Sequence, residues 1–142
     1  MSWNVTPSHE EICLLMEAGF ICRDANNFQE AREIFEGVQA LIPQNEVVDV
    51  ALGTLEFHQG RFDAATRRYL QALEKNPRSA YAHAHLGEVY LFKMKQAEAR
   101  RHLRTAMELD PRGDFGKLAR GLMEFTNVVR FNYEVEEGRH GN

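Results

Sequence analysis

The sequence has few of the residues that mark disulfide-bonded or membrane-spanning proteins. Its 142 residues include two cysteines, one tryptophan and four prolines. Cys13 and Cys22 are nine residues apart, a rise of roughly 13 Å along a helix, which is beyond the reach of a disulfide. No run of 18 apolar residues occurs, as a membrane-spanning helix would require. We therefore expect two reduced cysteines that behave as small buried hydrophobic residues, and no membrane partner.

The sequence also lacks an excess of positive charge. Its net charge is −4, whereas a protein that binds a phosphate backbone needs a positive field, so no nucleic-acid partner is expected. Residues 1–5 have neither the basic segment nor the apolar run of a secretory signal, which predicts a cytoplasmic protein. The length and the apolar content of 44% predict one globular domain over residues 1–142.

What the sequence does contain is an internal repeat with a period of 34 residues. Four kinds of position keep this step: Gly19, Gly53, Gly87 and Gly121; Ala31, Ala65 and Ala99; Phe35, Tyr69 and Leu103; and Pro43, Pro77 and Pro111. A shared register in four independent columns indicates a stack of similar structural units. Small residues let two helices approach closely, and each proline ends a helix.

These columns resemble the tetratricopeptide repeat, in which Leu-Gly, Tyr, Ala, an aromatic residue and Pro recur at fixed spacing. The third copy matches best, with Leu86-Gly87, Tyr90 and Ala99 in place, whereas Glu56 and Cys22 replace the tyrosine in the second and first copies. The resemblance implies an all-α fold of three helix-turn-helix repeats stacked in a right-handed superhelix. The repeats are expected at about residues 12–45, 46–79 and 80–113.

Local signals predict where the helices begin and end. Ser8 and Glu11 have the spacing of a capping box, and Asn45 and Ser79 are suited to cap two later helices. Together with the turn signals at Asn26-Asn27 and Gly60, they predict helices over residues 8–23, 28–41, 46–59, 61–75, 80–93 and 95–109.

A seventh helix is expected over residues 114–131, because Gly121 keeps the register but no further repeat follows it. It would cover the apolar face that the last repeat leaves exposed, the capping role of terminal units in such stacks. Residues 132–142 are expected to be a flexible tail. Their neighbourhood contains Phe131, Tyr133 and Val135, so an alternative is that the tail occupies the protein's own groove.

No catalytic, cofactor or metal motif is apparent, and we expect a protein that is not an enzyme. The segment from Gly113 to Leu118 has the wrong spacing for a phosphate-binding loop and ends in leucine. One candidate site remains, a metal or pH-sensing site that would form if His58 and His85 approach each other beside Glu88. Polar side chains that line a groove are the simpler interpretation.

The resemblance implies a concave groove lined by the first helix of each repeat. Carried over by register, the groove residues are Cys13, Met16, Phe20, Val47, Val50, Thr54, Phe57, His58, Tyr81, Ala84, His85, Glu88, Leu91, Phe92, Leu118, Leu122 and Phe125. This lining is mostly apolar. It does not resemble the Lys/Asn/Arg clamp with which some family members hold acidic peptide tails.

An apolar groove favours a protein client with hydrophobic anchors, bound as an extended peptide or an amphipathic helix. Three repeats, a closing helix and such a groove are similar to the tetratricopeptide chaperones of bacterial type III secretion, which hold hydrophobic translocator or needle components. The alternatives are an adaptor that docks a short peptide motif in a larger assembly, and a self-associating structural protein or homodimer. Five arginines on the second helices are expected to form a basic cluster on the convex side, which is either a solvated face or a surface for an acidic partner. They are Arg67, Arg68, Arg100, Arg101 and Arg104.

Overall fold

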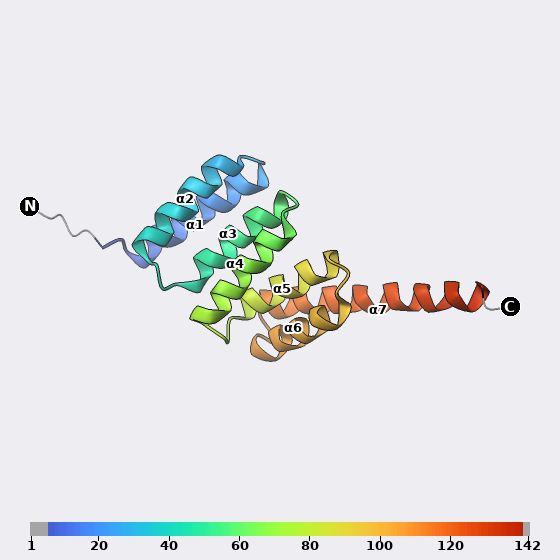
Figure 1. Cartoon of the computed structure of the whole chain (residues 1–142). Coiled ribbons are helices and arrows are strands. Elements are labelled where there is room, and N and C mark those ends of the chain that lie inside the picture. The colour runs from blue at the N-terminus through green and yellow to red at the C-terminus, as the bar shows by residue number, and fades with distance from the viewer. Residues whose placement is uncertain (1–5, 141–142) are drawn as a thin grey trace, which may run out of the picture. The chain divides into compact units, whose positions relative to one another are not determined.

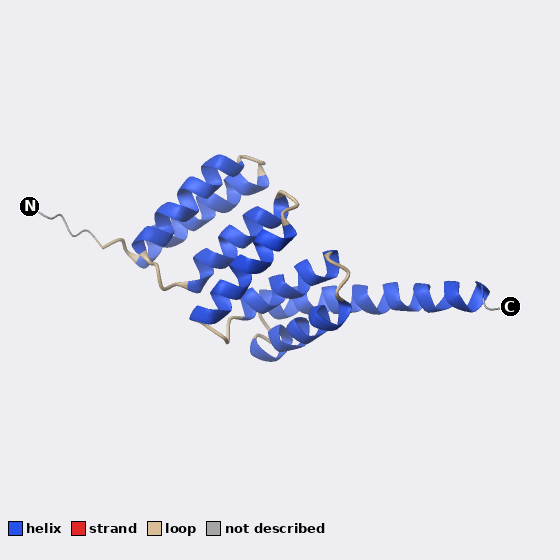
Figure 2. Ribbon diagram, viewed as in Figure 1, coloured by secondary structure: helices blue, strands red, loops and turns tan. Residues whose placement is uncertain are grey.

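The computed structural model describes the backbone of residues 6–140 and the side chains of residues 6–128 and 138. Within this part of the chain every regular element is an α-helix and no strand occurs (Figures 1 and 2). The helices are α1 (His9–Asp24), α2 (Phe28–Leu41), α3 (Glu46–His58), α4 (Phe62–Lys75), α5 (Ala80–Phe92), α6 (Gln96–Leu109) and α7 (Asp114–His140). None of these helices is long and apolar enough to cross a membrane.

The predicted bounds of the first six helices are correct to within one residue at each end. The predicted end of the seventh is wrong, because α7 continues beyond residue 131 to His140. Residues 132–140 contain no proline and four strong helix formers, three glutamates and one arginine, so nothing in the sequence stops the helix there. The side chains of Phe131, Tyr133 and Val135, which the self-occupied groove requires, lie outside the described residues.

The predicted helix caps are present. Ser8 and Glu11 form a reciprocal capping box, in which the Ser8 amide donates to Glu11 Oε2 at 2.7 Å and the Glu11 amide donates to Ser8 Oγ at 3.2 Å. Asn45 Oδ1 accepts from the Val47 amide at 2.9 Å. Ser79 Oγ caps α5 in the same way. Each cap satisfies a backbone amide that the helix itself leaves unpaired.

The turn inside each repeat contains one residue with a left-handed backbone. These residues are Asn26, Gly60 and Met94, with φ angles of 62°, 75° and 61°. They are 34 residues apart, so each repeat has the same left-handed backbone conformation at this turn position, even where the residue type differs. Glycine and asparagine adopt this conformation readily, whereas for methionine it is strained.

The glycine column marks the closest approach of the two helices within a repeat. A Cβ atom added to Gly53 would overlap the ring of Tyr69, and one added to Gly19 would overlap the ring of Phe35. A Cβ atom on Gly121 would meet nothing within 4 Å. The first pairs need glycine because the aromatic column of the second helix fills the space beside it, and α7 has no such second helix.

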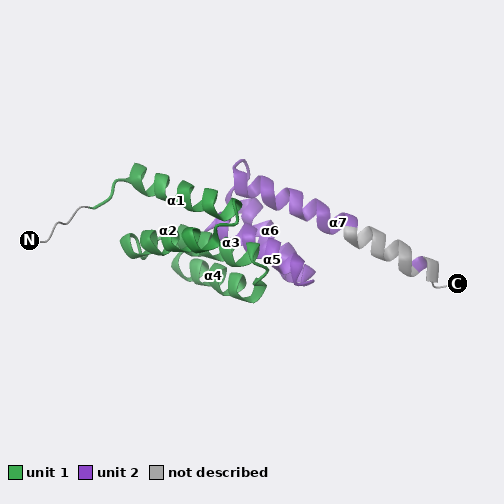
Figure 3. Cartoon of the chain, turned by 90° about the horizontal axis from the view of Figure 1, so that it is seen from above, with its two compact units in different colours: residues 1–77 green, residues 78–142 purple. Residues whose placement is uncertain are grey.

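The chain divides into two compact units, Met1–Pro77 and Arg78–Asn142 (Figure 3). In unit 1, α1 pairs with α2, α3 pairs with α4, and α2 packs on α3. Its core contains Phe35 and Val38 of α2 against Val48, Leu52 and Leu55 of α3, all of which are at most 1% exposed. The units divide after Pro77, two residues before the predicted end of repeat two at residue 79. The single domain and the right-handed superhelix stay predictions.

Unit 2 consists of the α5–α6 pair and α7. The α7 helix packs against both α5 and α6. Ala119 of α7 is buried with Ala84, Leu103 and Ala106, and Leu118 and Leu122 pack against this cluster. The seventh helix therefore covers an apolar face of the third helix pair, as the sequence predicts.

Candidate functional site

Five of the predicted groove residues of unit 1 remain accessible, and they belong to α1 and α3: Cys13, Phe20, Val47, Phe57 and His58. With Arg23 of α1 they form what we call the unit 1 face. The expectation that both cysteines are buried is wrong, because Cys13 is exposed and Cys22 is half-buried. The ring of Phe20 lies on the buried ring of Phe35, with a centroid distance of 5.2 Å. Phe57 packs in a similar way on Phe62 at 5.4 Å. These aromatic contacts fix the orientation of both accessible rings.

Arg23 is a residue of this face that the sequence analysis missed. Its guanidinium group lies 4.9 Å from the centroid of the Phe20 ring. It also donates to Thr54 Oγ1 at 2.9 Å and forms an ion pair with Asp24 at 2.8 Å. The side chain is only 16% exposed, so a cation is held in place on an otherwise apolar surface. The 34-residue step that relates Arg23 to Phe57 is the signal that could have revealed it.

The accessible groove residues of unit 2 come from α5 and α7: Tyr81, His85, Glu88, Leu91, Phe92, Leu118, Leu122 and Phe125. With Phe115 of α7 they form what we call the unit 2 face. Phe92 and Phe125 are 58% and 60% exposed. Exposure of this extent is unusual for two phenylalanines, and large exposed apolar groups often mark interaction sites.

A line of contacts along α5 organises the unit 2 face. The rings of Phe115 and Tyr81 are stacked at 4.5 Å with an interplanar angle of 18°. Tyr81 meets the imidazole of His85 edge to face at 5.0 Å, and His85 Nδ1 lies 3.2 Å from Glu88 Oε1. Phe115 was missed by the sequence analysis, although it lies 34 residues after Tyr81, in a column that the analysis had used.

The remaining four predicted groove residues are buried. Val50 and Ala84 are 0% exposed, Thr54 is 2% exposed and Met16 is 7% exposed. Thr54 Oγ1 donates to the carbonyl of Ala51 at 2.7 Å. These four side chains contribute to the core beneath the two faces, and a ligand cannot contact them directly in this conformation.

The histidines of the two faces are already held by neighbours on their own helices. His58 Nδ1 lies 2.8 Å from the backbone carbonyl of Thr54, and His85 is paired with Glu88. Among the described side chains, no group of three or more His, Cys, Asp or Glu residues could hold a metal ion. Each face offers apolar and aromatic contact surface, with the cation of Arg23 on the unit 1 face and the carboxylate of Glu88 on the unit 2 face. Surfaces of this kind suit peptide segments.

The predicted basic cluster lies on α4 and α6. Arg67, Arg101 and Arg104 are exposed, and Arg68 and Arg100 are half-buried. Arg100 Nη2 donates to Asn127 Oδ1 of α7 at 3.1 Å. A role of the exposed arginines toward an acidic partner stays a prediction.

The comparisons agree with the repeat register. Residues 53–92 match the family model described as TPR repeat. This segment contains the second half of α3, all of α4 and all of α5. The search of curated proteins finds no significant match to the sequence.

Several solved structures are similar to the chain as a whole. The type III secretion translocator chaperone SycD of Yersinia enterocolitica has a TM-score of 0.73 at 20% identity, over 89% of this chain and 97% of that one. SycD has also been solved with a peptide of the translocator YopD. The Sgt2 TPR domain from Aspergillus fumigatus has a TM-score of 0.72 at 16% identity, over 99% of this chain and 89% of that one.

A third similar structure is PcrH in complex with the chaperone binding region of PopB. Its TM-score is 0.68 at 18% identity, over 83% of this chain and 96% of that one. At these identities the likeness concerns the fold. The chain thus has the fold of tetratricopeptide-repeat proteins, with residues 53–92 matching the repeat family itself.

Proposed function

We propose that this protein is a cytoplasmic chaperone that binds hydrophobic segments of a client protein, through the unit 1 face and through the unit 2 face. The class of client that fits is a secreted or membrane-active protein, as in the translocator chaperones of type III secretion. The observation that carries the proposal is the exposure of Phe92 and Phe125, at 58% and 60%, among half-buried aromatic and aliphatic neighbours.

The mechanism is masking of apolar surface. A segment that would aggregate in water buries its anchors against Phe92, Phe125 and the half-buried leucines. Burial contributes roughly 25 cal/mol for each Å² of apolar surface removed from water. Binding lowers the concentration of free client by mass action, and the aggregation of the client is therefore suppressed.

Each face also carries one charged side chain. Arg23 presents a cation on the unit 1 face, and Glu88 presents a carboxylate on the unit 2 face. An apolar segment with an acidic residue would therefore match the unit 1 face, and one with a basic residue would match the unit 2 face. This pattern differs from a clamp made only of cations, which selects acidic peptides.

The similarity to SycD and PcrH supports this proposal, since both are solved with parts of a client. At 18–20% identity, this similarity concerns the fold alone. An adaptor that binds a motif from a partner that is soluble by itself is the alternative, and the test below is designed to separate the two.

The test is a pull-down from the native organism with three folded proteins: the wild type, a Phe92→Glu, Phe125→Glu double variant, and a Leu70→Glu control. Leu70 is also an exposed apolar residue, at 41%, but it lies on the second helix α4, outside both faces. The recovered partner is then produced alone and together with each protein, and its soluble fraction is measured.

A chaperone should recover one partner that is insoluble alone and soluble with the wild type or the Leu70→Glu control. The double variant should fail to recover or solubilise it. A partner that is equally soluble alone would identify an adaptor instead. Recovery by the double variant at the wild-type level would contradict the assignment of the faces.

A further inference from the structure

The outer side of α1 carries apolar residues that the fold of unit 1 does not use. Leu14 and Ile21 are 65% and 69% exposed. They lie seven residues apart, with Ala18 between them, so the three form a stripe along one side of the helix. This stripe points away from the core residue Met16, which is 7% exposed.

The repeat register shows what normally covers this stripe. The residues 34 positions later are Val48 in place of Leu14 and Leu55 in place of Ile21, and both are 0% exposed. In unit 1 they are buried against Phe35 and Val38 of the preceding helix α2. The stripe on α1 is therefore built like a surface on which an amphipathic helix packs, and among the described helices α1 is in contact with α2 and α3 only.

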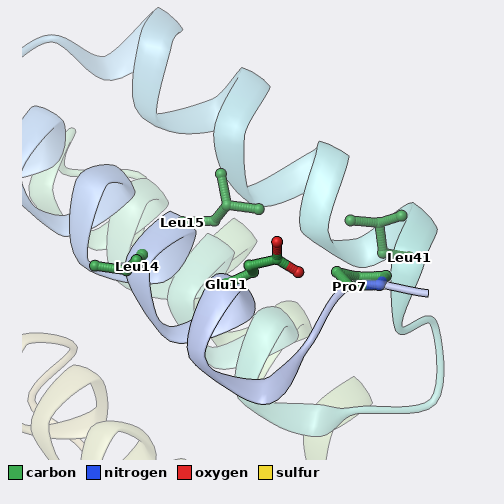
Figure 4. A pocket seen from close by; sticks show the side chains of 5 residues that line it. All are labelled: Pro7, Glu11, Leu14, Leu15 and Leu41. Atoms are coloured by element: carbon green, nitrogen blue, oxygen red, sulfur yellow. The ribbon is translucent and has the colours of Figure 1, made fainter. Parts of the chain in front are cut away.

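A pocket continues this surface toward the end of α2. It has a volume of about 470 Å³ and is lined by Pro7, Glu11, Leu14, Leu15 and Leu41. Figure 4 shows the carboxylate of Glu11 between the apolar side chains of Leu15, Leu41 and Pro7. We call the stripe and this pocket together the end face. Large apolar side chains left exposed side by side often mark an interaction site, so the exposure of Leu14 and Ile21 indicates a partner.

Charge indicates which kind of partner. Residues 9–41 contain seven acidic residues and two arginines, a net charge of −5, although the whole chain has only −4. Both arginines are engaged elsewhere, Arg23 with Thr54 and Asp24, and Arg32 with Glu56. The exposed charges beside the end face are thus carboxylates.

Three of these carboxylates border the stripe directly. Glu10 precedes Leu14 by one helical turn, Glu17 precedes Ile21 by one turn, and Glu11 lines the pocket itself. A second copy of the chain would bring the same net charge of −5 against this face, which opposes self-association. A helix with lysine or arginine beside its apolar residues would form ion pairs at both borders.

We infer that the end face docks a basic amphipathic helix of a partner protein, which packs on α1 as α2 packs on α3. This surface is distinct from the unit 1 and unit 2 faces, so the protein would hold two partners or two segments of one partner at the same time. Helix-in-groove recognition of this kind uses anchors at positions such as i, i+4 and i+7. Leu14, Ala18 and Ile21 have this spacing along α1.

The probe for this inference is a fluorescent 14-residue peptide with the sequence of α2, in which Glu30→Lys, Glu33→Lys and Glu36→Lys are introduced. The control peptide keeps the three glutamates. Both are held helical by the same hydrocarbon staple on the outer side, so that helix formation does not differ between them. Fluorescence anisotropy with the full chain gives the affinities.

We expect the lysine peptide to bind the wild type about tenfold or more tightly than the glutamate peptide, and its affinity to fall as salt increases. A Leu14→Glu, Ile21→Glu double variant should lose this binding. Both positions are exposed, so the variant should fold, and circular dichroism would test this before the binding measurement. The Leu70→Glu control and the Phe92→Glu, Phe125→Glu variant should bind the peptide like the wild type.

Equal affinity for the two peptides, or no binding of the lysine peptide at about 1 mM, would overturn the inference. So would a wild-type dimer in light scattering that the Leu14→Glu, Ile21→Glu variant converts to a monomer, because a second copy would then occupy the end face. Client capture through the unit 1 and unit 2 faces should survive the Leu14→Glu, Ile21→Glu change. The two proposals therefore fail independently.

Discussion

The imidazole rings of His83 and His102 lie nearly parallel inside unit 2, with their Nδ1 atoms 3.0 Å apart. Both residues are only 9% exposed. One Nδ1 donates a proton and the other accepts it, so at least one ring must be neutral. The ring of Tyr90 also stacks with that of His102, at a centroid distance of 5.6 Å, so three rings of α5 and α6 are in contact.

This contact should make unit 2 sensitive to acid. Burial, together with the nearby charges of His83 and Arg101, lowers the pKa of His102 to about 4. The unfolded chain therefore binds a proton that the folded chain refuses between pH 6.5 and about 4. The free energy of unfolding should fall by up to about 3 kcal/mol as the pH decreases through this window.

Urea denaturation at several pH values measures this effect. A His102→Asn variant keeps a group that can hydrogen-bond to His83 but does not titrate. Its free energy of unfolding should depend less steeply on pH between 6.5 and 4 than that of the wild type. Parallel slopes for the two proteins would show that the acid sensitivity arises elsewhere.

Glu56 should contribute a second, more acidic pH effect in unit 1. Burial by itself raises the pKa of Glu56, but hydrogen bonds and charges from Arg32 and Arg61 outweigh it and lower the pKa below 4.5. The stabilising ion pair, 2.7 Å between Arg32 and Glu56, is therefore complete above the unfolded pKa. It is lost as the pH falls through the lowered folded pKa.

At neutral pH, Glu56→Gln should reduce the free energy of unfolding by about 2 kcal/mol or more, because it leaves Arg32 without its buried counter-charge. Asp24→Asn is the matched control. Asp24 pairs with Arg23, but its side chain is 62% exposed, so the loss should be within about 0.5 kcal/mol. Similar losses for the two variants would mean that the burial of Glu56 does not increase the contribution of its ion pair to stability.

Met94 is expected to destabilise the protein through its backbone. Its φ angle of 61° is left-handed, and its side chain is 80% exposed and can contribute little packing. Met94→Gly should increase the free energy of unfolding by about 1 kcal/mol, and the melting temperature should rise accordingly. Gly60→Ala at the equivalent turn, with a φ angle of 75°, should lower stability by a similar amount. Thermal unfolding with no change for Met94→Gly would argue against strain at this turn.

Two glycines of the same column should respond to alanine in opposite directions. Gly53→Ala forces a Cβ atom into the ring of Tyr69, and overpacking of this kind costs about 1–3 kcal/mol. Gly121→Ala meets nothing within 4 Å and should stabilise α7 by about 0.5–1 kcal/mol through helix propensity. Denaturation curves of the two variants that shift in the same direction would contradict this account of the repeat.

The sequence predicts the helices well because their signals are local. Ser8, Asn45 and Ser79 cap helices with their own side chains, and the turn residues follow within a few positions. The end of α7 was predicted poorly, since no local stop signal lies near residue 131. A helix end can be predicted where capping or helix-breaking residues mark it in the sequence. Where such residues are lacking, the sequence does not define the end of the helix.

The accessible surface was harder to predict than the helices. Val50 and Ala84 share the column spacing of accessible residues but are buried. Arg23 reaches Thr54 and the Phe20 ring through a long side chain, a contact that depends on the tertiary placement of α3 beside α1. Exposure reflects packing of neighbouring helices, which the 34-residue period alone does not contain.

The central claim is that a client lies on the unit 1 and unit 2 faces, and site-specific photo-crosslinking tests it most directly. A benzoylphenylalanine residue would replace Phe125, His58 or, as a control outside both faces, Leu70. Irradiation in native cells should join one client to positions 125 and 58 and leave position 70 without a product. A client that crosslinks to position 70 and to neither of the others would contradict the claim.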